Sequence, residues 1–128
     1  MSSILRKTGI YIAYPTSSEL KSIYRPKNYK TMVNEKHTKV GIAKDCFEAR
    51  SKGYYSNFDN EVIFTPLAIL NDINELIAVE QFVLSQIHSE VTKVGRAREW
   101  FNTDNHKRIK EIVARSLSES GVPHEFVG

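Results

Sequence analysis

Three short segments rich in β-branched and aromatic residues constrain the fold of this chain more than any other feature. They are residues 8–14 (TGIYIAY), which stop at Pro15, residues 38–43 (TKVGIA) and residues 61–70 (EVIFTPLAIL). Segments of this length and composition, bounded by turn-forming residues, predict strands. Because proline cannot donate to a strand ladder, Pro66 inside the third segment predicts an edge position or a bulge.

A short helix is expected directly after the second strand. Asp45 is a suitable N-cap, Glu48 follows it at capping-box spacing, and Gly53 is a suitable stop, so the predicted helix covers residues 45–52. The preceding residues 15–36 are rich in serine, asparagine and proline, and they predict a long loop in which a helical turn around residues 18–24 is one option. Loops of this length in compact domains are often functional.

Two longer helices complete the predicted fold. Residues 71–87 carry apolar side chains at a spacing of three and four, and one acid, Glu80, lies on that apolar stripe. The last helix is expected to start near Thr103 or Asp104 and to end before Gly121. The order of elements predicts one α+β domain over residues 1–128, with a small three-stranded sheet covered by helices.

Composition restricts the classes to which the chain can belong. Its 128 residues are 41% hydrophobic and 26% charged, as in ordinary globular domains. A single cysteine, Cys46, excludes an internal disulfide and a four-cysteine zinc site, which suits a reducing compartment. No run approaches the length of a membrane span, and the first residues lack the apolar segment of a signal peptide. We therefore expect a cytoplasmic protein that has no membrane partner.

Positive charge is concentrated in two stretches, residues 21–44 and 93–110, within a chain of net charge +3. Two basic segments that flank a more acidic middle predict a surface for a phosphate backbone, although scattered solvated lysines are the ordinary alternative. The first stretch makes the loop at about residues 15–36 a basic insertion. The predicted DNA-binding residues are Lys21, Arg25, Lys27, Lys30, Lys36, Lys44, Arg96 and Arg98.

An ordered set of short motifs runs through most of the chain. GIY stands at residues 9–11 and KVG at 39–41, Arg50 and Tyr54 are four residues apart, and EWF stands at 99–101. Together with Glu80 on its helix, this set resembles the GIY-YIG nuclease superfamily, and within it a phage-associated branch. In KVG, lysine replaces the tyrosine after which the second motif is named. The resemblance implies a GIY-YIG-like fold and DNA cleavage.

The resemblance also assigns roles to residues. Tyr11 and Tyr54 compete for the part of general base, Arg50 stabilises the transition state, and Glu80 binds Mg²⁺ or Mn²⁺. Lys39 lowers the pKa of the phenol and contacts phosphate, because a nearby cation favours the phenolate. The residue types suit this chemistry, since arginine forks onto phosphate oxygens and magnesium takes one or two carboxylates. Asn102 is a candidate for the asparagine that the family places near the end of its core.

These features predict a metal-dependent DNA endonuclease, of the kind found among phage-borne homing enzymes, that uses a homodimer or a separate partner for specificity. The alternative is a non-catalytic nucleic-acid-binding module of the same fold. A protein-interaction or toxin domain with a basic surface is a third option. Ordinary structural roles compete residue by residue: a core aromatic for Tyr11, surface charges for Lys39 and Arg50, and a buried ion pair for Glu80. Trp100 and Phe101 are expected in the core, and Glu99 is expected to bind backbone or a basic side chain.

Overall fold

A computed structural model describes residues 3–23 and 31–128 and confirms the α+β class. After a short 3-10 turn, η1 (Ile4–Arg6), the helices are α1 (Phe47–Asn57), α2 (Ile73–His88) and α3 (His106–Ser120). The strands are β1 (Gly9–Pro15), β2 (Lys21–Ile23), β3 (Thr31–Val33), β4 (Thr38–Ala43), β5 (Val62–Ile69), β6 (Lys93–Val94), β7 (Ala97–Phe101) and β8 (Glu125–Phe126). Within the described part of the chain, no helix is long and apolar enough to cross a membrane.

The main sheet has six strands in the order β6-β7-β4-β1-β5-β8, so the expected number of three was wrong. The three predicted strands β1, β4 and β5 form its centre, and β1 pairs antiparallel with both neighbours. The additional strands lie at the two edges. Two of them, β6 and β8, contain only two residues each, which is too short to produce an alternating pattern in the sequence.

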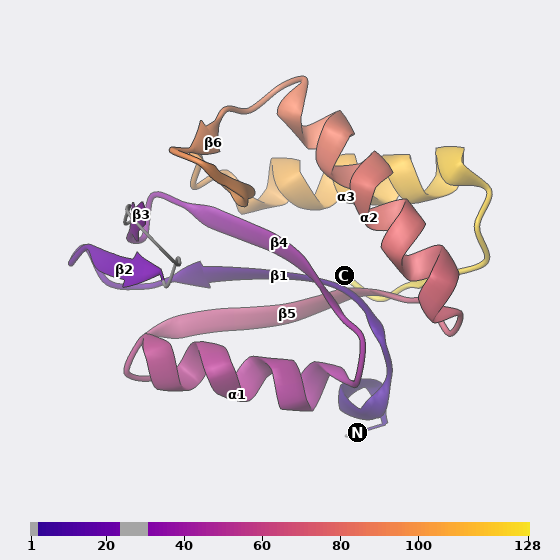
Figure 1. The fold of residues 1–128 in the computed structure, drawn as a ribbon, viewed down its shortest axis with the longest axis horizontal. Coiled ribbons are helices and arrows are strands. Elements are labelled where there is room, and N and C mark those ends of the chain that lie inside the picture. Colours follow the sequence, from indigo (N-terminus) through magenta and orange to yellow (C-terminus); the bar gives the residue numbers. More distant parts are fainter. Residues whose placement is uncertain (1–2, 24–30) are drawn as a thin grey trace.

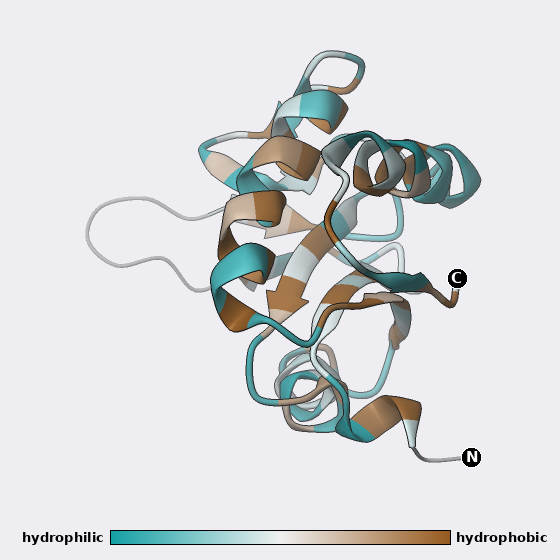
Figure 2. Ribbon diagram, turned by 90° about the vertical axis from the view of Figure 1, so that its right-hand side faces the viewer, coloured by the Kyte–Doolittle hydropathy of each residue, from teal (hydrophilic) through white to brown (hydrophobic). Residues whose placement is uncertain are grey.

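Helices cover both faces of the sheet, as Figure 1 shows. On one face, α2 and α3 pack on a core that includes Ile10, Ile12 and Val40. On the other face, α1 packs through Phe47 and Tyr54 on a smaller cluster. Figure 2 shows the molecule from the side, with both hydrophilic and hydrophobic residues along α2 and α3, as expected for helices that are half in the core.

Helix α1 begins later and ends later than the sequence indicated. Its N-cap is Cys46, whose Sγ accepts a hydrogen bond from the Ala49 backbone N–H at 3.4 Å, so the assignment of this role to Asp45 was wrong. The helix also continues through Gly53 to Asn57. Phe58 directly after it is buried, and we attribute the extra turn to this packing, which outweighs the low helix propensity of glycine.

The described parts of the long loop form a hairpin rather than a helical turn. Lys21, Ser22 and Ile23 of β2 pair antiparallel with Val33, Met32 and Thr31 of β3. Residues 24–30 lie outside the described part of the chain. The prediction of a bulge at Pro66 is confirmed, because the β1–β5 register shifts between Ile10 and Tyr11, opposite Pro66 and Ala68.

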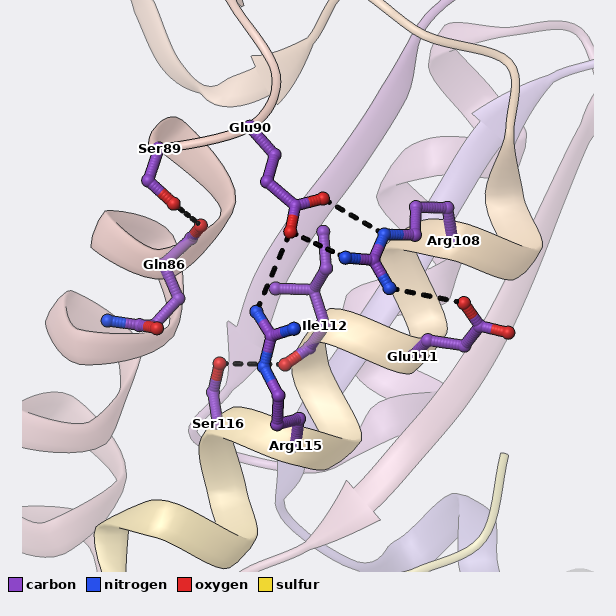
Figure 3. A network of polar contacts seen from close by, with 8 residues as sticks. All are labelled: Gln86, Ser89, Glu90, Arg108, Glu111, Ile112, Arg115 and Ser116. Atoms are coloured by element: carbon purple, nitrogen blue, oxygen red, sulfur yellow. Dashed lines mark hydrogen bonds and ion pairs between the residues drawn. The ribbon is translucent and has the colours of Figure 1, made fainter.

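An ion-pair network joins the ends of the two helices on the first face (Figure 3). Glu90, just beyond α2, accepts two hydrogen bonds from Arg108 of α3, from Nε at 2.9 Å and from a terminal nitrogen at 2.5 Å. Arg108 also contacts Glu111, and Arg115 lies 3.8 Å from Glu90. This two-pronged pairing of Arg108 with one carboxylate fixes α3 against the end of α2.

Candidate functional site

The site is built around a buried tyrosine on the central strand. Tyr11 is 2% exposed and lies opposite Gly41 in the β1–β4 register. A Cβ at position 41 would lie 2.5 Å from the Tyr11 Oη and 2.7 Å from its Cζ, closer than real Cβ contacts come. Glycine in the KVG motif therefore leaves the space that the phenol ring of the GIY motif occupies.

Tyr11 contacts the second candidate base directly. Its hydroxyl lies 2.6 Å from the hydroxyl of Tyr54, and its ring stacks on Phe64 with the centroids 4.5 Å apart. Burial raises the pKa of Tyr11 far above its ordinary value, and Tyr54 adds to the rise, while Arg50 opposes it. The expectation that Lys39 would lower this pKa was wrong for Tyr11, because loss of hydration outweighs the effect of the nearby cation, which is Arg50.

Three of the predicted catalytic residues line one open pocket of about 280 Å³. Lys39 comes from β4, and Arg50 and Tyr54 come from successive turns of α1, which places the two on one side of the helix. Ile23 and Trp100 complete the apolar part of the wall. The pocket thus combines two cations with a phenol, a combination that suits an anionic ester.

Two carboxylates interact with Lys39 of this pocket. The Lys39 Nζ lies 2.5 Å from an oxygen of Glu99 on β7, an ion pair that confirms the expected basic partner of Glu99. Glu80 of α2 is 9% exposed. Burial raises the pKa of Glu80 to about 7, the Glu99 carboxylate adds to the rise, and Lys39 and Lys44 oppose it. Glu80 does not line the pocket, but its charge is linked to the pocket through Lys39 and Glu99.

Glu99 is a site residue that sequence analysis did not select. EWF predicted core residues at Trp100 and Phe101, and this is confirmed, since both are at most 1% exposed. The sequence signal that could have selected Glu99 is its place as the first residue of the EWF motif. Its meaning depends on the β4–β7 register, in which Lys39 faces Trp100, and this pairing could not be read from one sequence.

The predicted DNA-binding residues are dispersed over several surfaces. Lys21 is paired with Asp59 at 2.8 Å, whereas Arg25, Lys27 and Lys30 lie outside the described residues. Lys36 is exposed in the turn before β4, and Lys44 is exposed beside Arg50 in a second pocket of about 310 Å³.

The remaining candidates lie near the β6–β7 hairpin and line neither of these two pockets. Arg96 is exposed in the turn of the hairpin, and Arg98 lines a separate pocket that also contains Lys93. Asn102 is exposed directly after β7, and its backbone N–H donates to the carbonyl of Thr92 at 2.8 Å. The structure therefore brings Lys44, but not Arg98 or Asn102, beside the predicted catalytic residues.

For a metal ion, the described residues offer a pair of carboxylates at this site. Among residues 3–23 and 31–128, no group of three or more histidine, cysteine, aspartate or glutamate residues is placed to hold an ion. Glu99 pairs with Lys39, and both of these residues act on the pKa of Glu80, so the two carboxylates are close to each other. Comparisons with protein-family models, with curated proteins and with solved structures found no match to this chain.

Proposed function

We propose that this chain is a metal-dependent DNA endonuclease of the GIY-YIG type. The observation that carries the proposal is the shared pocket of Lys39, Arg50 and Tyr54, which joins residues from β4 and α1. All three belong to the ordered motif set of the sequence, in which Lys39 begins the KVG motif. Fold and motifs together favour phosphodiester hydrolysis over a general anion site.

In this proposal, Arg50 and Lys39 hold the phosphate. The Arg50 guanidinium remains charged at any working pH and donates two parallel hydrogen bonds to phosphate oxygens. Lys39 supplies a point charge from the opposite wall of the pocket, and its side chain is 12% exposed because Glu99 and the strand cover it. Charge that develops on the reacting phosphate is then stabilised from two sides.

We assign the role of general base to Tyr54. It lines the pocket, whereas Tyr11 is buried behind it and stays neutral because burial raises its pKa. A neutral Tyr11 donates its hydroxyl hydrogen to the Tyr54 oxygen across the 2.6 Å contact. Tyr54 is thereby oriented toward the pocket. There its ionised form accepts a proton from the attacking water and becomes the neutral phenol, while the hydroxide oxygen bonds to phosphorus.

Glu80 and Glu99 are the residues that we propose to hold Mg²⁺ or Mn²⁺. The donor set fits, because hard divalent cations take one or two carboxylates and complete their coordination with water and substrate oxygens. When bound, the ion supplies positive charge for the leaving oxygen. Glu99 must share its charge with Lys39, so the ion pair also keeps the lysine beside the metal site.

The proposal is tested by incubating supercoiled plasmid with the purified protein in magnesium, in manganese and in chelator. We expect metal-dependent nicking or cutting that falls at least about a hundredfold in Arg50→Ala and Glu80→Gln, because each removes a transition-state contact. Lys52→Ala is the matched control, since this exposed cation lies on the same helix and lines neither pocket beside Arg50. Cleavage that persists in both site variants, or that needs no metal, would contradict the assignment.

One observation favours a second candidate, a nucleic-acid-binding module without catalysis. The Lys39–Glu99 ion pair neutralises one of the two carboxylates within the protein itself. If that pairing persists in the presence of metal, the pocket retains its phosphate-binding cations but lacks the second carboxylate ligand. A folded protein that shifts DNA in a gel, with no cleavage in any metal, would favour this candidate.

A further inference from the structure

Gly53 occupies a helix position that the fold itself does not explain. It lies inside α1, where glycine is less favourable than alanine by about 1 kcal/mol. Its backbone is not in the left-handed region. Apart from its chain neighbours and the adjacent backbone of α1, no atom of the described residues lies within 4 Å of the place where its Cβ would be. Neither backbone conformation nor packing inside the described structure therefore requires glycine here.

The position has a second property, because Gly53 lies where two open pockets meet. The first pocket, of about 280 Å³, holds Lys39 and Tyr54, and the second, of about 310 Å³, holds Lys44 and Cys46 at the start of α1. Arg50 and Gly53 line both. The two pockets therefore adjoin at Arg50 and Gly53, and we call this pair of pockets the α1 groove.

The charges of this groove define the class of its ligand. Lys39, Arg50 and Lys44 are distributed along it, with Asp45 as the one acid among the residues that line either pocket. A row of cations along a groove, interrupted by a site with no side chain, suits a linear polyanion whose backbone must approach the helix closely.

We propose that a DNA strand lies in this groove, with its sugar–phosphate backbone crossing α1 at Gly53 and consecutive phosphates on the two sides of Arg50. This inference rests on the proposed function for the class of substrate. It adds that Lys44 contacts the strand in the second pocket and that position 53 must carry no side chain. The cleavage pocket alone would not need Lys44, which lines only the second pocket.

The test uses Gly53→Gln, which fills the groove without adding charge. Because glutamine favours helix more than glycine does, we expect the melting temperature to rise by about 3–5 °C. In the same variant, the Kd for a fluorescent DNA oligonucleotide, measured by anisotropy in chelator, should increase at least about tenfold through loss of contact with the groove. Gly53→Ala should be stabilised at least as much as Gly53→Gln, with a smaller loss of affinity.

Ser56→Gln is the matched control, since Ser56 is exposed on α1 and lines neither pocket. Its affinity should equal that of the wild type. Equal affinity of Gly53→Gln and the wild type would overturn the groove assignment, even if plasmid cleavage proved the nuclease. Weaker DNA binding by a Gly53→Gln variant that is more stable than the wild type would support the groove assignment, even if no metal gave cleavage. The experiment therefore tests the groove assignment independently of the nuclease proposal.

Discussion

Substitution of Gly41 by alanine tests the tyrosine site through its packing. Without neighbours, alanine would be favoured over glycine in a strand by roughly 0.5–1 kcal/mol. Here the new Cβ would lie 2.7 Å from the Tyr11 Cζ, about 1 Å inside an ordinary carbon–carbon contact. Overpacking of this kind costs about 1–3 kcal/mol, so we expect a net loss of about 1–2 kcal/mol in the free energy of unfolding.

The phenol has little freedom to relieve this contact. Tyr11 is 2% exposed, its ring stacks on Phe64, and its hydroxyl is bonded to Tyr54. The Lys39 Cε lies 3.2 Å from the same point, but it belongs to a flexible side chain and can move. The strain therefore falls on Tyr11, and we expect Gly41→Ala to displace the phenol from Tyr54.

The assay is urea unfolding of Gly41→Ala in the wild type and in Tyr11→Leu, which lacks the two atoms in closest contact. We expect the cost of the alanine to be lower by at least about 1 kcal/mol in the Tyr11→Leu background, as a double-mutant cycle would detect. An alanine variant as stable as the wild type, or one that costs the same in both backgrounds, would refute the packing explanation.

Two further predictions concern opposite dependences of stability on pH. Because the pKa of Glu80 is raised in the folded protein, its contribution to stability is fully present below about pH 4.5. This contribution is lost as the pH rises through about 7. Glu80→Gln should therefore unfold with a free energy about 1–3 kcal/mol above that of the wild type at pH 8 in chelator, and with little difference near pH 4. The ring of His106 stacks on Tyr14 with the centroids 3.4 Å apart, and burial lowers the pKa of this histidine. Its contribution to stability is therefore present above about pH 6.5 and is lost as the pH falls. His106→Phe keeps the stacked ring and should lose less stability than the wild type between about pH 8 and pH 5; urea unfolding at several pH values checks both variants, and parallel profiles would contradict them.

The centre of the fold could be predicted because its signals are local. β1 and β4 follow from runs of β-branched and aromatic residues, and α2 and α3 follow from apolar side chains at helical spacing. The edges could not be predicted, because β6 and β8 are only two residues long, and β8 also depends on pairing with the distant strand β5. The end of α1 was misplaced because the propensity of Gly53 is a local property, whereas the burial of Phe58 is not.

The residues of the site were predictable from motif order, but their relationships were not. Tyr11 and Tyr54 were both chosen as candidate bases, yet only the β1–α1 packing shows that one is buried behind the other. Glu99 was overlooked, because its role depends on Lys39 across the β4–β7 pairing. The chemical type of each site residue can be read from the sequence, whereas its burial and its interaction partners depend on contacts between distant segments.

The position of Tyr54 connects the fold to the proposed chemistry. Had α1 ended at residue 52, Tyr54 would lie in a loop, and its hydroxyl would not be held between Tyr11 and the pocket. The helix continues across Gly53, so Arg50 and Tyr54 stay one turn apart and point into the same pocket. Gly53 thus lies in the turn that must remain helical for the proposed chemistry and uncovered for the proposed strand. A stabilising substitution at this position is therefore expected to improve the helix while it weakens binding.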